Sequence, residues 1–237
     1  MNQDPDRAAF PLWGLPLLAG LLPLLAVLIA FNLAVAQGQF AGCNPLLEGC
    51  VSISRAARHD LPNILFRALL LPAATLQAIV WLLCGPWLRQ LGVAPGRLQR
   101  ALPWIGVIAA ASLVLYGTFL GTEGTGYRLM RRYGVYVYFG FTCISMLIVA
   151  GALQNVVSST PWLRRAVVVL NALVVALPLL GIANSMRPLF VSDEATLHAI
   201  GNTTEWWGGL VFTVFFVAVA WLWWRTRFDA TLRATVG

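Results

Sequence analysis

The sequence alternates between long apolar runs and short polar segments, and six of the runs have the length of a membrane-spanning helix. A helix needs about 20 mostly apolar residues to cross the hydrocarbon core of a bilayer. The runs are continuously apolar and lack the residue-by-residue alternation of strands in an outer-membrane barrel. The predicted spans are residues 11–36, 61–84, 103–121, 133–157, 166–185 and 206–224.

The composition agrees with this pattern. Hydrophobic residues make up 59% of the 237 residues and charged residues only 11%, and the mean hydropathy is +0.77. An average soluble domain is about 25% charged, so this chain has too little polar surface for a water-soluble globule. We therefore predict an all-α, polytopic membrane protein in which residues 1–237 form one domain of six transmembrane helices.

The positive charge predicts an orientation. The net charge is +7, and on a membrane protein basic residues mark the cytoplasmic side and contact anionic headgroups, so we expect no nucleic-acid partner. Nine arginines lie in segments on the side of the two termini and six on the opposite side, which predicts that the N- and C-termini are cytoplasmic. The nine are Arg7, Arg89, Arg97, Arg100, Arg164, Arg165, Arg225, Arg227 and Arg233; the six are Arg55, Arg58, Arg128, Arg131, Arg132 and Arg187.

The polar segment between the first two spans carries two of the four cysteines. Under the predicted orientation Cys43 and Cys50 share an outer loop, in a compartment where disulfides persist. We expect them to form a disulfide, the alternative being two reduced cysteines in a loop. Cys84 and Cys143 fall within spans and are expected to be small buried hydrophobic residues. A longer outer loop is predicted from Arg187 to Thr204.

The chain lacks the patterns of several membrane enzymes. His59 and His198 are both predicted in outer loops, so neither is placed to bind a haem within the membrane. Their spacing from nearby acidic residues matches no familiar metal-ligand pattern, and the C-x6-C spacing of the loop cysteines differs from a reactive C-x-x-C pair. No G-x-S-x-G, P-loop or H-E-x-x-H motif is present. We expect no metal and no cofactor.

Charged residues at membrane depth are the remaining functional candidates, because such residues are costly there. Arg67 lies within the second predicted span, where its side chain can extend toward the outer surface. It can pair with Glu123 or Glu205, which border the third and sixth spans, or bind a lipid phosphate, for which a guanidinium is well suited. These two interpretations stay open.

Several segments, in order, resemble the Frag/DRAM/Sfk family of six-span membrane proteins. They are "CVSISRAARHDLPNILFRALLLPAATL", "IGVIAAASLVLYGTF", "RLMRRYGVYVYFGFTCISMLI" and "AIGNTTEWWGGLVFTVFF". The family includes the damage-regulated autophagy modulators and proteins of GPI-anchor lipid remodelling. Its P-x-I-S type element stands here as Val51 to Ser54, with valine in place of proline, and its acid-plus-Trp element as Glu205-Trp206. Where the family often has a histidine, this chain has Arg131-Arg132.

The resemblance implies roles in lipid remodelling, in scaffolding of lipid kinases or in trafficking, and it transfers no catalytic set of residues. We predict a protein that binds or helps remodel membrane lipids at the outer leaflet, with phospholipids as its partners. The alternatives are a non-enzymatic scaffold for another membrane protein and, with less support, a small-solute transporter. We expect a multi-pass protein of the bacterial inner (plasma) membrane. The candidate lipid- or substrate-binding residues are Ser52, Ser54, Asp60, Arg67, Glu123, Arg131, Arg132 and Glu205.

Overall fold

The computed structural model describes residues 8–156 and 160–232, and most of these residues are helical. Six helices are long and apolar enough to cross a membrane, which confirms the all-α, six-span fold class. They are α1 (Gly14–Ala36), α3 (Asp60–Gln90), α4 (Arg97–Phe119), α5 (Thr125–Gln154), α6 (Pro161–Met186) and α7 (Glu194–Arg225). The short elements are β1 (Ala8–Pro11), α2 (Ile53–Ala56), η1 (Arg187–Leu189) and β2 (Asp229–Leu232).

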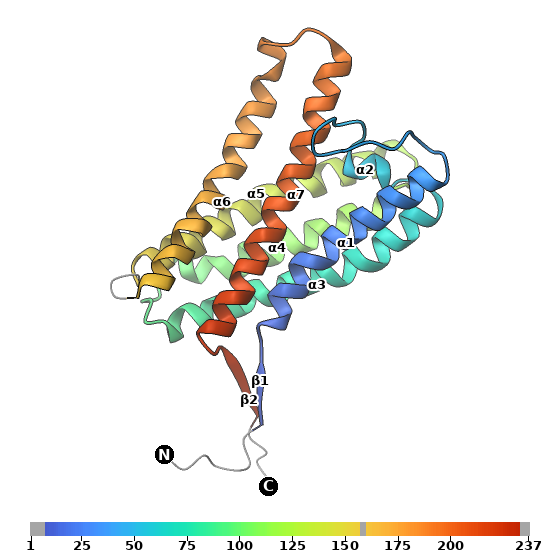
Figure 1. Cartoon of the computed structure of the whole chain (residues 1–237). Coiled ribbons are helices and arrows are strands. Elements are labelled where there is room, and N and C mark those ends of the chain that lie inside the picture. Colours follow the sequence, from blue (N-terminus) through green and yellow to red (C-terminus); the bar gives the residue numbers. More distant parts are fainter. Residues whose placement is uncertain (1–7, 157–159, 233–237) are drawn as a thin grey trace.

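The two termini lie at the same end of the helical bundle. β1 and β2 pair as antiparallel strands, with Ala8 opposite Leu232 and Pro11 opposite Asp229 (Figure 1). We call this the terminal end, and we call the opposite end, which carries the segment 37–52 and α2, the loop end. An even number of spans requires this arrangement. Which end faces the cytoplasm stays a prediction.

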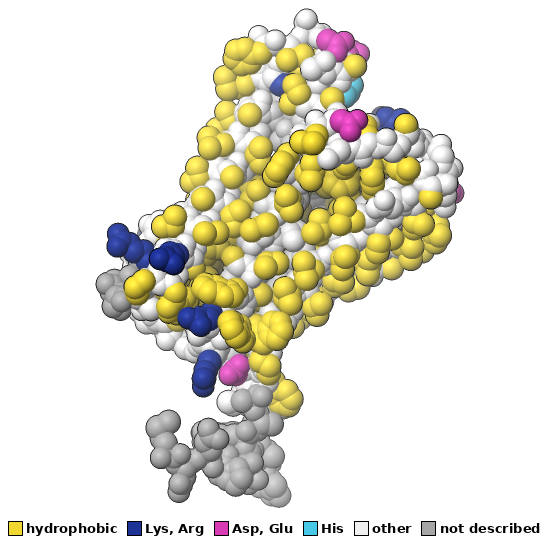
Figure 2. All heavy atoms as spheres, viewed as in Figure 1, with side chains coloured by type: hydrophobic (Ala, Val, Ile, Leu, Met, Phe, Trp, Pro, Cys, Tyr) yellow, Lys and Arg dark blue, Asp and Glu magenta, His cyan; other side chains and the backbone are white. Residues whose placement is uncertain are grey.

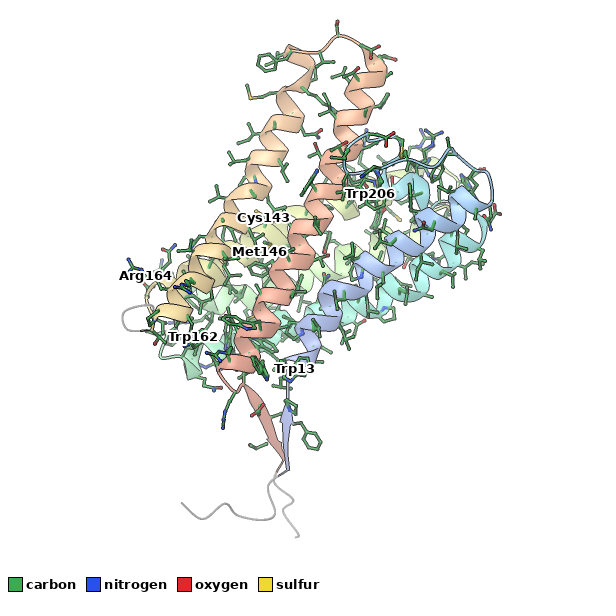
Figure 3. The ribbon with its side chains drawn as sticks, in the orientation of Figure 1. Trp13, Cys143, Met146, Trp162, Arg164 and Trp206 are labelled. Atoms are coloured by element: carbon green, nitrogen blue, oxygen red, sulfur yellow. A yellow bond between two sulfur atoms is a disulfide. The ribbon has the colours of Figure 1, made fainter. Side chains whose placement is uncertain are left out.

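The surface is divided as a bilayer requires. Hydrophobic side chains cover the middle of the visible face, and charged side chains gather toward its two ends (Figure 2). Trp13 and Trp162 lie toward the terminal end and Trp206 toward the loop end (Figure 3). Tryptophans at both ends are typical of membrane–water interfaces.

Proline and glycine shape the centre of the bundle. Pro23 has no backbone N–H, so the carbonyl of Ala19, one turn earlier in α1, loses its helical partner. The Nε2 group of Gln77 in α3 donates to that carbonyl at 3.1 Å, which satisfies it without water. Gly20 lets α7 approach, since a Cβ there would lie 2.8 Å from the Cβ of Phe216. These contacts hold α1 between α3 and α7.

The helices extend further into the polar segments than the apolar pattern indicates. The predicted outer loop from 187 to 204 is wrong, because α7 begins at Glu194, and His198 therefore lies in a helix. Asp193 caps this helix by accepting hydrogen bonds from the N–H and the hydroxyl of Thr196, at 2.8 and 2.7 Å. With 32 residues α7 is about 48 Å long, against about 30 Å of hydrocarbon. Its first turns, with the end of α6, project beyond the other helices (Figure 1).

The loop cysteines lie at disulfide distance, as predicted. Cys43 and Cys50 are paired with their Cα atoms 6.6 Å apart, within the usual range for a disulfide. Cys84 is buried, in agreement with the sequence, whereas Cys143 on α5 is partly exposed.

Candidate functional site

A cavity with several positively charged side chains lies at the loop end, between α5 on one side and α6 and α7 on the other. The cavity has a volume of about 630 Å³ and is partly open to its surroundings. Residues of α2, α4 and the α2–α3 connection complete its wall. Its charged residues are Arg58, Arg128, Arg131, Arg132 and Glu205. We call it the arginine pocket.

Helical spacing brings three of these arginines together. Arg128, Arg131 and Arg132 lie in the first turns of α5, and residues three and four apart in a helix are neighbours on its surface. Val135 and Phe139 continue the same wall deeper into the pocket. The helix begins at Thr125, earlier than the predicted span at 133, so these arginines belong to a helical face and not to a loop.

Arg131 has a structural role within this group. Its Nη1 group donates to the carbonyl of Phe119, the last residue of α4, at 3.0 Å and to the carbonyl of Thr122 in the following turn. The amide of Asn63 fixes the same turn by donating to the carbonyls of Leu120, at 3.1 Å, and of Ala57, at 2.9 Å. The start of α5, and with it the arginine pocket, is therefore held in place from α3 and α4.

Glu205 enters the pocket from α7 and is partly buried. The backbone of Ile53 and Ser54, at the beginning of α2, and the guanidinium group of Arg58 act on its carboxylate electrostatically. A carboxylate is favoured at the start of a helix, where N–H groups lack internal partners. Ser52 caps the same helix, accepting from the N–H of Arg55 at 3.2 Å. Glu205 thereby joins α2 to α7.

The disulfide-linked loop is docked on the first half of α7. The Nδ2 group of Asn202 donates to the carbonyl of Gly49 at 2.7 Å. The indole N–H groups of Trp206 and Trp207 donate to the carbonyls of Val51 and Leu46, at 2.9 and 3.1 Å. These bonds fix the loop, and therefore α2, against the helix that carries Glu205.

A small apolar cavity adjoins the arginine pocket. Its volume is about 90 Å³, it lies among α1, α3, α4, α5 and α7, and it shares four lining residues with the pocket: Tyr116, Val135, Phe139 and Glu205. The Oε1 atom of Gln77, which also lines this cavity, is buried without a hydrogen-bond partner among the described residues. The polar pocket thus leads toward an apolar interior, with Glu205 at the junction.

Four of the eight residues predicted from the sequence meet at this pocket: Ser54, Arg131, Arg132 and Glu205. Ser52 lies beside them, with its hydroxyl 3.3 Å from that of Ser54.

The other three predicted residues lie apart from the pocket wall. Arg67 lines a different, shallow pocket on α3 with Ile64, Ala68, Leu71 and Pro72. Asp60 is the exposed first residue of α3, and Glu123 is exposed in the α4–α5 turn. The structure therefore does not bring Arg67 into the same pocket as Glu205.

Several polar residues of the pocket were not among the predicted site residues, and three of them are Arg128, Arg58 and Asn184. Arg128 could have been found from its spacing to Arg131 and Arg132 on a helix that starts early. Arg58 and Asn184 are brought in by tertiary packing, from the α2–α3 connection and from α6, and no local pattern marks them. The Oδ1 atom of Asn184 is buried and has no hydrogen-bond partner within residues 8–156 and 160–232.

Within the described part of the chain, no three His, Cys, Asp or Glu residues are grouped as a metal site would require. The chemistry that this arrangement offers is recognition of charge by four arginines and one carboxylate. Comparisons of the chain with protein-family models, with curated proteins and with solved structures gave no match.

Proposed function

We propose that this membrane protein binds a phospholipid in the arginine pocket, with the phosphate held by arginines of α5. The observation that carries the proposal is the combination of four arginines in a cavity of about 630 Å³ with an adjoining apolar cavity, at one end of a six-span bundle.

The charge of the pocket favours an anionic group. Its lining includes four arginines and one carboxylate, so an anion enters with a net attraction. A guanidinium can donate two parallel hydrogen bonds to a phosphate, which makes arginine the preferred residue for this task. Arg131 already donates to two backbone carbonyls. We therefore assign phosphate binding mainly to Arg128 and Arg132, which are exposed.

The depth of the pocket agrees with a headgroup. α5 has 30 residues and is about 45 Å long, so about 15 Å of it extends beyond the hydrocarbon core. Arg128 and Arg132 lie in its first turns, where headgroup phosphates are found. Leu177 and Leu180 of α6 also line the pocket and offer apolar surface to the acyl chains.

The disulfide-linked loop supports the outer leaflet as the source of the lipid. Disulfides persist in the periplasm or outside the cell, and the arginine count of the sequence predicts that the loop end lies there. Under this proposal the lipid enters between α5 and α6 from the leaflet at the loop end.

Native mass spectrometry of the purified protein tests the proposal. We expect the wild type to retain a phospholipid. An Arg128→Gln/Arg132→Gln double variant should retain at least about tenfold less, because charge-assisted hydrogen bonds to phosphate are lost. Arg67→Gln is the matched control, since Arg67 lies in a different pocket. Equal retention by all three proteins would refute the proposal.

A scaffold role is the second candidate, and one observation favours it. In the most apolar stretch of the span formed by α6, only 17% is buried inside the bundle, whereas 39–56% of the corresponding stretch is buried in the other spans. Such a helix offers a long apolar face to lipid or to another membrane protein. Cross-linking from cysteines placed on this face, such as Val168→Cys, distinguishes the two: a scaffold gives a protein adduct in native membranes, and a lipid-facing helix gives none.

A further inference from the structure

We infer that the arginine pocket prefers a phospholipid whose headgroup carries a primary amine beside its phosphate, with Glu205 and Asn184 as acceptors for the amine. This inference deepens the proposed function and rests on it. It concerns the two acceptor groups in a pocket otherwise dominated by donors.

Glu205 is unfavourable for a purely anionic ligand. A carboxylate in the same cavity repels a phosphate, and this repulsion offsets part of the attraction of the arginines. A headgroup that also carries a cation converts the repulsion into an attraction. The backbone N–H groups of Ile53 and Ser54 act on this carboxylate from the start of α2. An ionised carboxylate has about four acceptor positions, so it can accept further hydrogen bonds from a ligand.

Asn184 provides an independent observation that points to a donor. Asn184 of α6 is one of the residues that line the arginine pocket, and its Oδ1 atom is buried and lacks a hydrogen-bond partner among the described residues. Leaving a buried acceptor without a partner is costly, so such atoms are normally satisfied. An ammonium group carries three N–H donors and can bond to an amide oxygen and a carboxylate together.

The headgroup that matches this arrangement is phosphoethanolamine. Its phosphate suits the guanidinium groups of Arg128 and Arg132, and its amine suits the acceptors on α6 and α7. A choline headgroup has the same charges but no N–H donor. A glycerol headgroup has hydroxyl donors but no positive charge. The pocket is therefore expected to distinguish three phospholipids with identical acyl chains.

The test measures lipid retention by native mass spectrometry in detergent micelles that contain phosphatidylethanolamine, phosphatidylcholine or phosphatidylglycerol of the same acyl composition. For the wild type we expect the ethanolamine lipid to be retained about tenfold better than the other two, which is the effect of one charge-assisted hydrogen bond. Glu205→Gln should abolish the preference. Glu123→Gln, which changes an exposed carboxylate outside the pocket wall, should keep it.

The possible failures are distinguishable. If the wild type retains all three lipids equally, the inference is wrong and the proposed function stands. If it retains none of them, the proposed function is wrong as well. The comparison of lipids on the wild type needs no variant, so it decides the question even where Glu205→Gln does not fold. Asn184→Leu gives a second variant, in which the preference should fall while binding of phosphatidylglycerol is unchanged.

Discussion

Replacing Gly49 with alanine should release the disulfide-linked loop from α7. Gly49 has a backbone φ of +60°, a conformation that residues other than glycine rarely adopt. A Cβ at this position would lie 2.5 Å from the hydroxyl of Thr203 and even closer to the carbonyl of Ala199. The backbone of a helix cannot move to make room, so the loop must move away.

The expected magnitude follows from the contacts that the loop makes. Three hydrogen bonds, from Asn202, Trp206 and Trp207, hold it on α7. At a net value of about 1 kcal/mol each they contribute about 3 kcal/mol. Alanine in a left-handed conformation adds about 1 kcal/mol. A loss of about 3–4 kcal/mol corresponds to a hundredfold or larger rise in the fraction of molecules with an open loop.

Hydrogen exchange of the protein in lipid nanodiscs, read by mass spectrometry over residues 44–56, measures this opening. Gly38→Ala is the matched control: Gly38 has a φ of +71°, but no atom lies within 4 Å of a Cβ placed there. We expect faster exchange of the loop in Gly49→Ala and little change in Gly38→Ala. Equal exchange in the two variants would mean that the close approach to α7 is not what holds the loop, and the reasoning would be refuted.

Three further predictions address the parts of the molecule that support the pocket. Arg131→Gln should lower the free energy of unfolding by about 3 kcal/mol, because the carbonyls of Phe119 and Thr122 lose a charged donor. Arg132→Gln should change the free energy of unfolding by less than about 0.5 kcal/mol. Equal melting temperatures of the two variants would contradict these different roles. Cys43→Ser should lower the free energy of unfolding by about 2–3 kcal/mol in the chain-entropy model, which is measured as a lower melting temperature. Adding a reductant to the wild type should lower its melting temperature by the same amount. Gly106→Ala should lower the free energy of unfolding by about 1–3 kcal/mol, because the added methyl group overpacks against the side chain of Trp81 in α3. Gly151→Ala has open space around its Cβ and should be nearly neutral in the same melting assay.

The six spans could be predicted from the sequence because each needs only a run of about 20 apolar residues. The helix ends could not, because the helices continue through polar residues that a hydropathy pattern excludes. The start of α7 depends on the cap at Asp193, and the start of α5 lies among exposed residues that include Arg128. The disulfide pair was predictable from its short spacing in one loop.

The candidate site was predictable in part. Glu205, Arg131 and Arg132 stand out as charges at the ends of spans, and the structure brings them into one pocket. Arg67 stands out equally in the sequence, but it lies on a face of α3 that lines a different pocket. Which face a helix presents to its neighbours depends on packing. Arg58 reaches the pocket only because the segment that carries it is folded against the bundle. These placements arise from contacts between distant parts of the chain.

The most direct test of the account is a crystal structure of the protein grown in a lipidic mesophase that contains phospholipid. The account predicts density for a phosphate within hydrogen-bond distance of Arg128 and Arg132, with acyl chains between α5 and α6. A structure with a headgroup bound at Arg67 and no phosphate in the arginine pocket would contradict it.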